Sequence, residues 1–410
     1  MSAQLLFYLI IGIVILDFIF DQVLDYLNTK HFRDPIPDEL NDVYNAEEYE
    51  KSQNYKIEKN KLSQYTSWIS FIGLVLVLIF EGFAFVDEIA RDLVSHPILV
   101  AFVFFGILML ASEIISTPFS YYATFVIEER FGFNKMTPKT FWIDKLKGLI
   151  LGSIIGGLLL GLIIWFYQIY PDTFWIYAWV LISVFSIVMN MFYAKLIVPL
   201  FNKQTPLEDG ILRDKIEAYA QKVGFKLDNV YVIDGSKRST KANAYFSGFG
   251  SQKRITLYDT LIKDLSEDEI VAVLAHEVGH YKHKHIFYNL SLSIITTGVT
   301  LWLLSLLVGN PLLSQALGVQ QPGFHIGLVA FGILYTPIST FTGLLMNVLS
   351  RKFEYQADNY AKNTFAGQYL ISSLKKLSQK SLSNLTPHSL YVKVHYSHPT
   401  LLQRIKNLNS

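Results

Sequence analysis

Residues 264–285 read DLSEDEIVAVLAHEVGHYKHKH and contain the spacing His276-Glu277-x-x-His280. Residues four apart on an α-helix lie one turn apart on the same face, so the two imidazoles can bind one metal ion. Glu277 lies between them in the sequence and can act on a water at that metal. A bare spacing of this kind also arises by chance, so the surrounding residues have to indicate a helix.

The surrounding residues predict a helix with a defined start. Ser266 and Glu269 have the S-x-x-E spacing of a capping box. Three acidic residues at 267–269 fall in the first turn, where the helix dipole favours negative charge. Ile270 and Leu274 belong to the apolar face that follows. The metal-binding spacing is therefore predicted to lie on a capped, amphipathic helix.

The composition indicates a chain that buries or inserts much apolar surface. Of 410 residues, 51% are hydrophobic and 17% are charged, against about 25% charged in average globular chains. The formal net charge of +1 offers no electrostatic basis for binding nucleic acid. There is no cysteine, which excludes thiolate ligands, disulfides and a cysteine nucleophile. Any metal must be held by histidine and carboxylate.

Seven hydrophobic runs are long enough to cross a bilayer, which takes about 20 residues each. The sequence predicts five spans with their loops in residues 1–194, a soluble segment at 195–285, two spans in 286–350, and a soluble C-terminal part at 351–410. Residues 286–350 contain no Asp, Glu, Lys or Arg. The fourth span has small-xxx-small spacings that suit close helix packing, at Gly152, Gly156, Gly157 and Gly161.

The distribution of Lys and Arg predicts the orientation in the membrane. The loops after the first and third spans carry six and five of these residues, whereas the loop after the second carries only Arg91. The loops after the fourth and sixth spans carry none, and the segments after the fifth and seventh are basic. The helix at 264–285 and the C-terminus are therefore expected on the cytoplasmic side.

A third protein ligand is expected beside two histidines and a water. Two spans separate His280 from Arg351, so the segment after the seventh span returns to the same side of the membrane. It contains Glu354 and Asp358, four residues apart. Glu354 is the predicted third ligand, and Asp358 could accept the other ring N–H of a ligand histidine. The alternative for Glu354 is a solvated carboxylate paired with Arg351.

This donor set predicts metal-assisted hydrolysis. The metal would lower the pKa of its water, and Glu277 would take the proton and later deliver it to the leaving amine. A donor for the developing oxyanion could come from His398 or Tyr396, and the residues alone leave both open. Position 286 is Ile, which excludes a third histidine at the spacing HExxHxxGxxH.

Several further motifs, spread over nearly the whole chain, carry a family resemblance. They are EERFGFNKMT at 128–137, DGSKRST and NAYFSGF within 234–249, RITLYDTL at 254–261, HEVGH at 276–280, SRKFEYQAD at 350–358 and HPTLLQR at 398–404. With the seven spans, they make the chain resemble the type I CAAX prenyl endopeptidases, integral-membrane zinc metalloproteases related to the yeast a-factor converting enzyme. The resemblance implies a mainly α membrane protein. Its seven transmembrane helices would form a barrel around an intramembrane chamber, with a small α+β zinc metalloprotease domain at the cytoplasmic end.

The resemblance also implies roles for individual residues. One Zn²⁺ would have three protein ligands: His276, His280 and Glu354. Glu277 would be the catalytic base. Asn243 would hold the substrate backbone beside an edge strand, so that the peptide adds as an extra strand. Arg404 would line the site, and His398 rather than Tyr396 would donate a hydrogen bond in the transition state.

The implied substrate is a peptide or protein, prenylated or similar, cut near its C-terminus by a monomer in a lipid bilayer. Eukaryotic members carry a long charged insertion where this chain has only residues 262–269, and no endoplasmic-reticulum sorting signal ends the chain. These departures predict a prokaryotic member in the plasma membrane with a cytoplasmic catalytic domain; the alternative is the endoplasmic-reticulum membrane.

Two other functions fit parts of the pattern. A membrane-protein quality-control protease like the HtpX-type relatives would use the same chemistry, although such proteins have fewer spans. A seven-helix transporter or receptor with an incidental HExxH would use the carboxylates in or near the spans as an ion path: Asp17, Asp21, Glu81 and Glu113. The capped helix and the matching position of Glu354 favour the peptidase.

Overall fold

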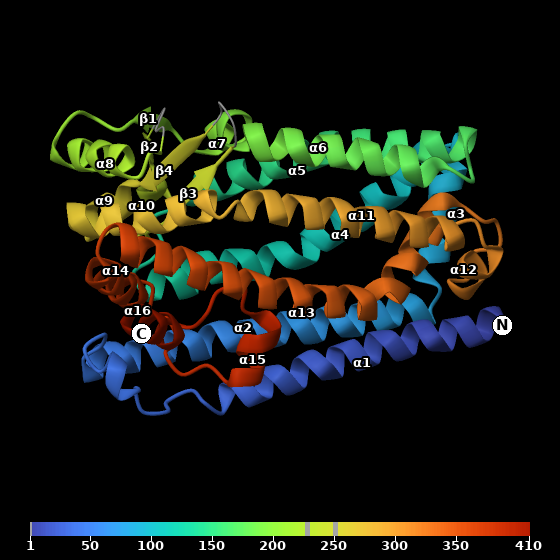
Figure 1. Cartoon of the computed structure of the whole chain (residues 1–410). Coiled ribbons are helices and arrows are strands. Elements are labelled where there is room, and N and C mark those ends of the chain that lie inside the picture. The colour runs from blue at the N-terminus through green and yellow to red at the C-terminus, as the bar shows by residue number, and fades with distance from the viewer. Residues whose placement is uncertain (1, 226–229, 249–252) are drawn as a thin grey trace.

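The computed structural model describes residues 2–225, 230–248 and 253–410. Within these residues, seven helices are long and apolar enough to cross a membrane. They are α1 (Ala3–Thr29), α2 (Ala46–Ile79), α4 (Pro97–Tyr122), α5 (Pro138–Ile169), α6 (Phe174–Leu196), α11 (His285–Leu307) and α13 (Phe324–Thr364). In Figure 1 they run along the long axis of the molecule, as expected of a membrane-spanning bundle. The seven predicted spans are confirmed.

A small mixed sheet lies at one end of the bundle, here called the sheet end, with the C-terminus; the N-terminus lies at the far end (Figure 1). The strands are β1 (Gln204–Pro206), β2 (Val230–Ile233), β3 (Ala244–Ser247) and β4 (Arg254–Tyr258), in the order β1-β2-β4-β3. β2 and β4 are parallel, and both outer strands are antiparallel to their neighbours. β3 is therefore an edge strand. Residue 249 of NAYFSGF lies outside the described residues.

Short helices complete both ends of the bundle. At the sheet end they are α7 (Val198–Phe201), α8 (Ile211–Lys222), α9 (Asp259–Asp264), α10 (Glu267–Lys282), α14 (Gly367–Lys380), α15 (Ser389–His395) and α16 (Leu401–Asn409). At the far end they are α3 (Gly82–Leu93) and α12 (Pro311–Ala316) (Figure 1). The predicted combination of a helical membrane part with a small α+β domain is confirmed.

Helix α10 begins where the sequence predicts it. Ser266 is the N-cap and forms both bonds of a capping box with Glu269. Glu269 is buried and also accepts hydrogen bonds from Ser372 at 2.6 Å and Lys376 at 2.8 Å, both on α14. Burial by itself would raise the pKa of Glu269, but these hydrogen bonds lower it to about 2. The start of α10 is thus tied to α14 as well as capped.

Helix α13 is one continuous helix of 41 residues. It extends past the predicted boundary at residue 350 and ends at Thr364. The sequence changes there from apolar to charged, but nothing in SRKFEYQAD breaks a helix. This continuity carries Glu354 and Asp358 on the same rod as the last membrane span, and both side chains are buried.

The glycines of the fourth span show less packing than predicted. An added Cβ would meet nothing within 4 Å at Gly152, Gly156 or Gly157, whereas at Gly161 it would lie 3.0 Å from Phe102. Of these four glycines, therefore, only Gly161 lies at a close helix contact in the described structure.

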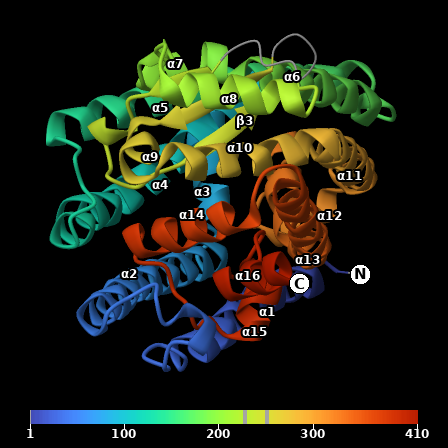
Figure 2. The same ribbon diagram turned by 60° about the vertical axis from the view of Figure 1, so that its left-hand side comes forward.

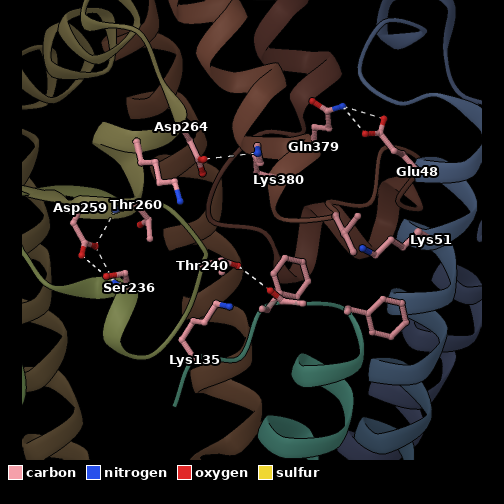
Figure 3. Close-up of a pocket in the computed structure, with 15 residues that line it drawn as sticks. Glu48, Lys51, Lys135, Ser236, Thr240, Asp259, Thr260, Asp264, Gln379 and Lys380 are labelled. Carbon is pink, nitrogen blue, oxygen red and sulfur yellow. Dashed lines mark hydrogen bonds and ion pairs between the residues drawn. The ribbon is translucent and has the colours of Figure 1, made fainter. Parts of the chain in front are cut away.

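The loop before β3 is fastened to the membrane helices. Arg238 donates two hydrogen bonds to Asp144 on α5, at 2.8 and 3.0 Å. Ser239 pairs with Asn134 in an isolated β-bridge. The Thr240 hydroxyl donates to the carbonyl oxygen of Gly132, as the dashed line in Figure 3 shows. Two motifs far apart in the sequence, at 128–137 and 234–240, therefore pack together.

Candidate metal centre

Three predicted ligands converge between α10 and α13. His276 and His280 lie one turn apart on α10, and Glu354 faces them from α13. Glu354 Oε1 lies 3.2 Å from His280 Nε2, and Glu354 Oε2 lies 3.5 Å from His276 Nε2. One ligand atom from each residue falls within 4.8 Å of the others. His276, His280 and Glu354 therefore form one cluster, as the spacing on α10 and the number of membrane crossings predict.

Gly279 allows the two helices to approach this closely. A Cβ added at Gly279 would lie 3.0 Å from the Cα of Ala357 and 3.1 Å from its carbonyl oxygen. Only a residue without a side chain fits such a backbone contact. Gly279 lies between the two histidines in HEVGH, so the position that brings α13 close is part of the same motif.

Hydrogen bonds on the outer ring nitrogens orient both histidines. His276 Nδ1 lies 2.9 Å from Asp358 Oδ1, as predicted for Asp358. His280 Nδ1 lies 2.9 Å from His285 Nδ1, and His285 Nε2 lies 2.9 Å from Gln356 Oε1. If each outer Nδ1–H donates to its partner, the Nε2 lone pairs of both ligands point into the centre.

The atoms that point into the centre are nitrogens and oxygens with lone pairs. The two Nε2 atoms face each other at 3.1 Å. Glu354 Oε2 is buried and has no hydrogen-bond partner among the described residues. Two nitrogens and a carboxylate are a donor set that binds a catalytic metal and leaves a further position open. The residues present therefore fit a divalent cation.

Electrostatics support the same conclusion. Burial alone would lower the pKa of His276, but its hydrogen bonds with Asp358 and Glu354 raise that pKa to about 9. The surroundings of His276 thus favour a positive charge at this point. Arg404 supplies one, donating to Asp358 at 2.9 and 2.5 Å, and its own pKa is raised because these carboxylates outweigh the effect of burial.

Arg404 lies behind the centre, with its side chain only 12% exposed. Besides bonding Asp358, it lies 3.7 Å from Glu354 Oε2. The structure thus places Arg404 against Glu354, a predicted metal ligand, and against Asp358, which contacts the predicted ligand His276. Its predicted contact with substrate stays a prediction.

The predicted base and the predicted donor are both partly accessible. Glu277 on α10 is half-buried and makes no hydrogen bond to any described residue. His398 is 64% exposed and its Nε2 lies 3.4 Å from Glu354 Oε1. Ser397 Oγ lies 2.9 Å from the other ring nitrogen of His398. The roles of Glu277 and His398 toward a substrate stay predictions.

Asn243 precedes edge strand β3, which runs beside α10 (Figure 2). Rings of Phe246 on β3 and Tyr281 on α10 lie 5.7 Å apart. The Asn243 side-chain oxygen accepts from the N–H of Ala244 at 2.9 Å, and its carbonyl accepts from Tyr258. These bonds fix Asn243 at the start of the edge that a peptide could extend.

His285 is a contributor that the sequence interpretation did not identify. It follows His280 by five residues, beyond the helical turn at which one side chain supports another. Lys284 takes a left-handed conformation (φ 58°) between α10 and α11, so the two helices do not form one continuous helix, and the His285 ring contacts that of His280. No turn residue such as Gly or Asn marks this break in the sequence.

Comparison with known proteins gives the family. Residues 25–203 match the family described as CAAX prenyl protease N-terminal, five membrane helices, and residues 206–410 match peptidase family M48. The chain is 35% identical to CAAX prenyl protease 1 of Saccharomyces cerevisiae over 98% of this chain and 94% of that protein. It is 33% identical to the human CAAX prenyl protease 1 homolog over 94% and 90%.

A solved structure shows the same fold along the entire chain. The crystal structure of S. mikatae Ste24p matches with a TM-score of 0.94 and 35% sequence identity, covering 100% of both chains. M48 peptidases are metallopeptidases, and the donor set formed by His276, His280 and Glu354 agrees with that chemistry. The chain therefore belongs to peptidase family M48 and is an integral-membrane metalloendopeptidase.

Proposed function

We propose that this enzyme binds one Zn²⁺ and cuts peptide bonds near the C-terminus of CAAX-type substrates, prenylated or similar. The observation that carries the proposal is the set of His276, His280 and Glu354, of which His276 and Glu354 are buried, beside an open edge strand. The names of the matching proteins support the substrate class. They do not favour the quality-control or transporter alternatives.

In this mechanism Zn²⁺, held by His276, His280 and Glu354, would supply the positive charge that activates water and polarises the scissile carbonyl. The Glu277 carboxylate takes a proton from the attacking water and delivers it to the leaving amine. His398 donates a hydrogen bond to the oxygen on which negative charge develops.

Other residues hold these groups in place. Asp358 and His285 orient the two imidazoles, and Arg404 orients Asp358. Asn243 and the free edge of β3 hold the peptide backbone, so the substrate adds to the sheet as another strand. The hydrogen bonds of Asp358, His285 and Arg404 fix the donor set before the substrate arrives, which lowers the cost of reaching the transition state.

The proposed orientation in the membrane follows from the positions of the Lys and Arg residues in the loops. The basic loops all lie at the sheet end, which we place in the cytoplasm of a monomer. Both membranes considered from the sequence, a prokaryotic plasma membrane and the endoplasmic reticulum, give this end the same cytoplasmic exposure.

Substrate profiling tests the function. The purified, zinc-loaded protein would be offered prenylated and unprenylated CAAX peptides and an unfolded membrane protein, with mass spectrometry of the products. We expect cleavage near the C-terminus of the CAAX peptides. Glu277→Gln should retain zinc and lose at least about a hundredfold in kcat, because it cannot take the proton. Cleavage of the unfolded protein alone, or full turnover by Glu277→Gln, would contradict the proposal.

A further inference from the structure

A second feature of the site lies in the cavity next to the metal centre. This cavity of about 400 Å³ is lined by His398 and Arg404 and reaches Lys56 on α2. None of its 13 lining residues is Asp or Glu, while His395 also faces it. Arg404 is already bound to Asp358, so Lys56 is the one Lys or Arg side chain in its wall that has no carboxylate partner among the described residues. The cavity is therefore suited to an anion.

Lys56 has no anionic partner of its own among the described residues. It is half-buried, and its ammonium lies 5.4 Å from the ring centre of Tyr55. The charged side chains around it are Lys59, Lys241 and Glu128. The two lysines repel the Lys56 ammonium. The Glu128 carboxylate attracts it but already accepts hydrogen bonds from Tyr55 and Lys241. A partly desolvated ammonium without a partner is costly, and a bound anion would offset that cost.

The carboxylate of Glu128 is used to place α2 against the loop before β3. Its two oxygens accept from Tyr55 at 2.6 Å and from Lys241 at 2.8 Å. Lys241 Nζ also donates to the hydroxyl oxygen of Tyr55 at 2.8 Å. A π-helical stretch at the end of α4, Ala123–Glu128, carries this carboxylate into position.

This network locates Lys56 relative to the substrate edge. Lys56 follows Tyr55 on α2, and Lys241 is two residues before Asn243. Lys56 therefore lies at the N-terminal end of β3. A peptide that pairs antiparallel with β3 directs its own C-terminus toward that end, so its terminal carboxylate would approach α2.

We propose that Lys56 binds the free α-carboxylate of the substrate's C-terminal residue. The proposal deepens the proposed function and rests on it for the substrate class. Three extended residues beyond the cut bond span about 10 Å. A cation at a fixed distance from the metal centre would thus measure the length of the C-terminal segment, and so confine cleavage to the end of the chain.

The test compares ligands that differ only at the C-terminus. Binding of an aliphatic tripeptide as free acid and as amide would be measured by calorimetry on the full, zinc-loaded chain in detergent. Cleavage of a CAAX peptide in both forms would be measured beside it. We expect the acid to bind at least about tenfold more tightly than the amide, the effect of a charge-assisted hydrogen bond.

Variants assign this preference to one residue. Lys56→Met should abolish the acid preference and Lys56→Arg should keep most of it. Lys59→Met is the matched control, since Lys59 lies one turn away, is exposed and contacts Glu128 at 3.7 Å; it should behave like the wild type. Zinc content and melting temperature report whether each variant is folded.

The outcomes separate this inference from the proposed function. Equal binding and cleavage of acid and amide by the wild type would overturn the role of Lys56 even if CAAX peptides are cut. Full preference in Lys56→Met would do the same. If no CAAX peptide is cut but acid binding depends on Lys56, the carboxylate site stands and the substrate assignment fails.

Discussion

At the scale of single residues, two chains of hydrogen bonds converge on the metal centre. One runs from Arg404 through Asp358 to His276, and the other from Gln356 through His285 to His280. If Nδ1 of each histidine carries the proton and donates it to its chain, Nε2 is left free for the proposed metal. Glu354, with a buried oxygen that has no hydrogen-bond partner among described residues, completes the set.

The role of His285 can be tested by substitution. His285→Ala removes the group that orients His280, and the metal affinity should fall about 10- to 100-fold. A competition titration with a chelator measures this. His283→Ala is the matched control, because its ring stacks 5.5 Å from His285 but makes no hydrogen bond to a ligand. Equal affinities in both variants would remove His285 from this role.

At the scale of secondary-structure elements, the positions of the three predicted ligands depend on how α10 packs against α13 and α14. Gly279 brings α13 to α10, and the capping box at the start of α10 ties it to α14. The two contacts lie near opposite ends of the 16-residue helix. Together, the contact at Gly279 and the capping box hold both ends of α10 in place. His276 and His280 lie near the Gly279 end.

Gly279→Ala tests the close approach of α10 and α13. The new Cβ would press on the backbone of Ala357, so the helices must separate and Glu354 must withdraw from the histidines. We expect a lower melting temperature, by an overpacking cost of about 1–3 kcal/mol, and weaker metal binding. Gly157→Ala, where nothing lies within 4 Å, should leave both nearly unchanged. Unaltered metal affinity in Gly279→Ala would show that the contact is not needed.

Glu269 predicts how stability varies with pH. Its pKa falls from an ordinary value of 4.5 to about 2 in the folded protein, so folding favours the ionised form. The stabilisation is fully present above about pH 4.5 and is lost as the pH falls towards 2. The melting temperature of wild type should therefore exceed that of Glu269→Gln at pH 6, and the difference should shrink at pH 3. A difference independent of pH would contradict this assignment.

At the scale of the whole molecule, hydropathy and helical spacing predict much of the design. Seven apolar runs give the spans, and the parity of crossings brings Glu354 to the side of His276 and His280. Asp358 follows from Glu354 by one helical turn. These inferences succeed because each depends on a local pattern or on counting crossings.

Other features depend on contacts between distant residues and leave no local pattern. The pairs Arg238–Asp144 and Lys241–Glu128 join positions 94 and 113 residues apart. The continuity of α13 past residue 350 is hidden by its change in polarity, and the break between α10 and α11 occurs at Lys284, a residue type that rarely adopts a left-handed backbone. Such details require the folded structure, although the motifs at 128–137 and 234–240 already mark the segments involved.

The proposed mechanism depends on His276, His280 and Glu354 binding one zinc ion together. The direct measurement is the zinc content per chain, determined by mass spectrometry of the purified protein and two variants. We expect about one zinc in the wild type and in Glu277→Gln, and almost none in Glu354→Ala at the same protein concentration. Full zinc occupancy in folded Glu354→Ala would show that Glu354 is not a zinc ligand.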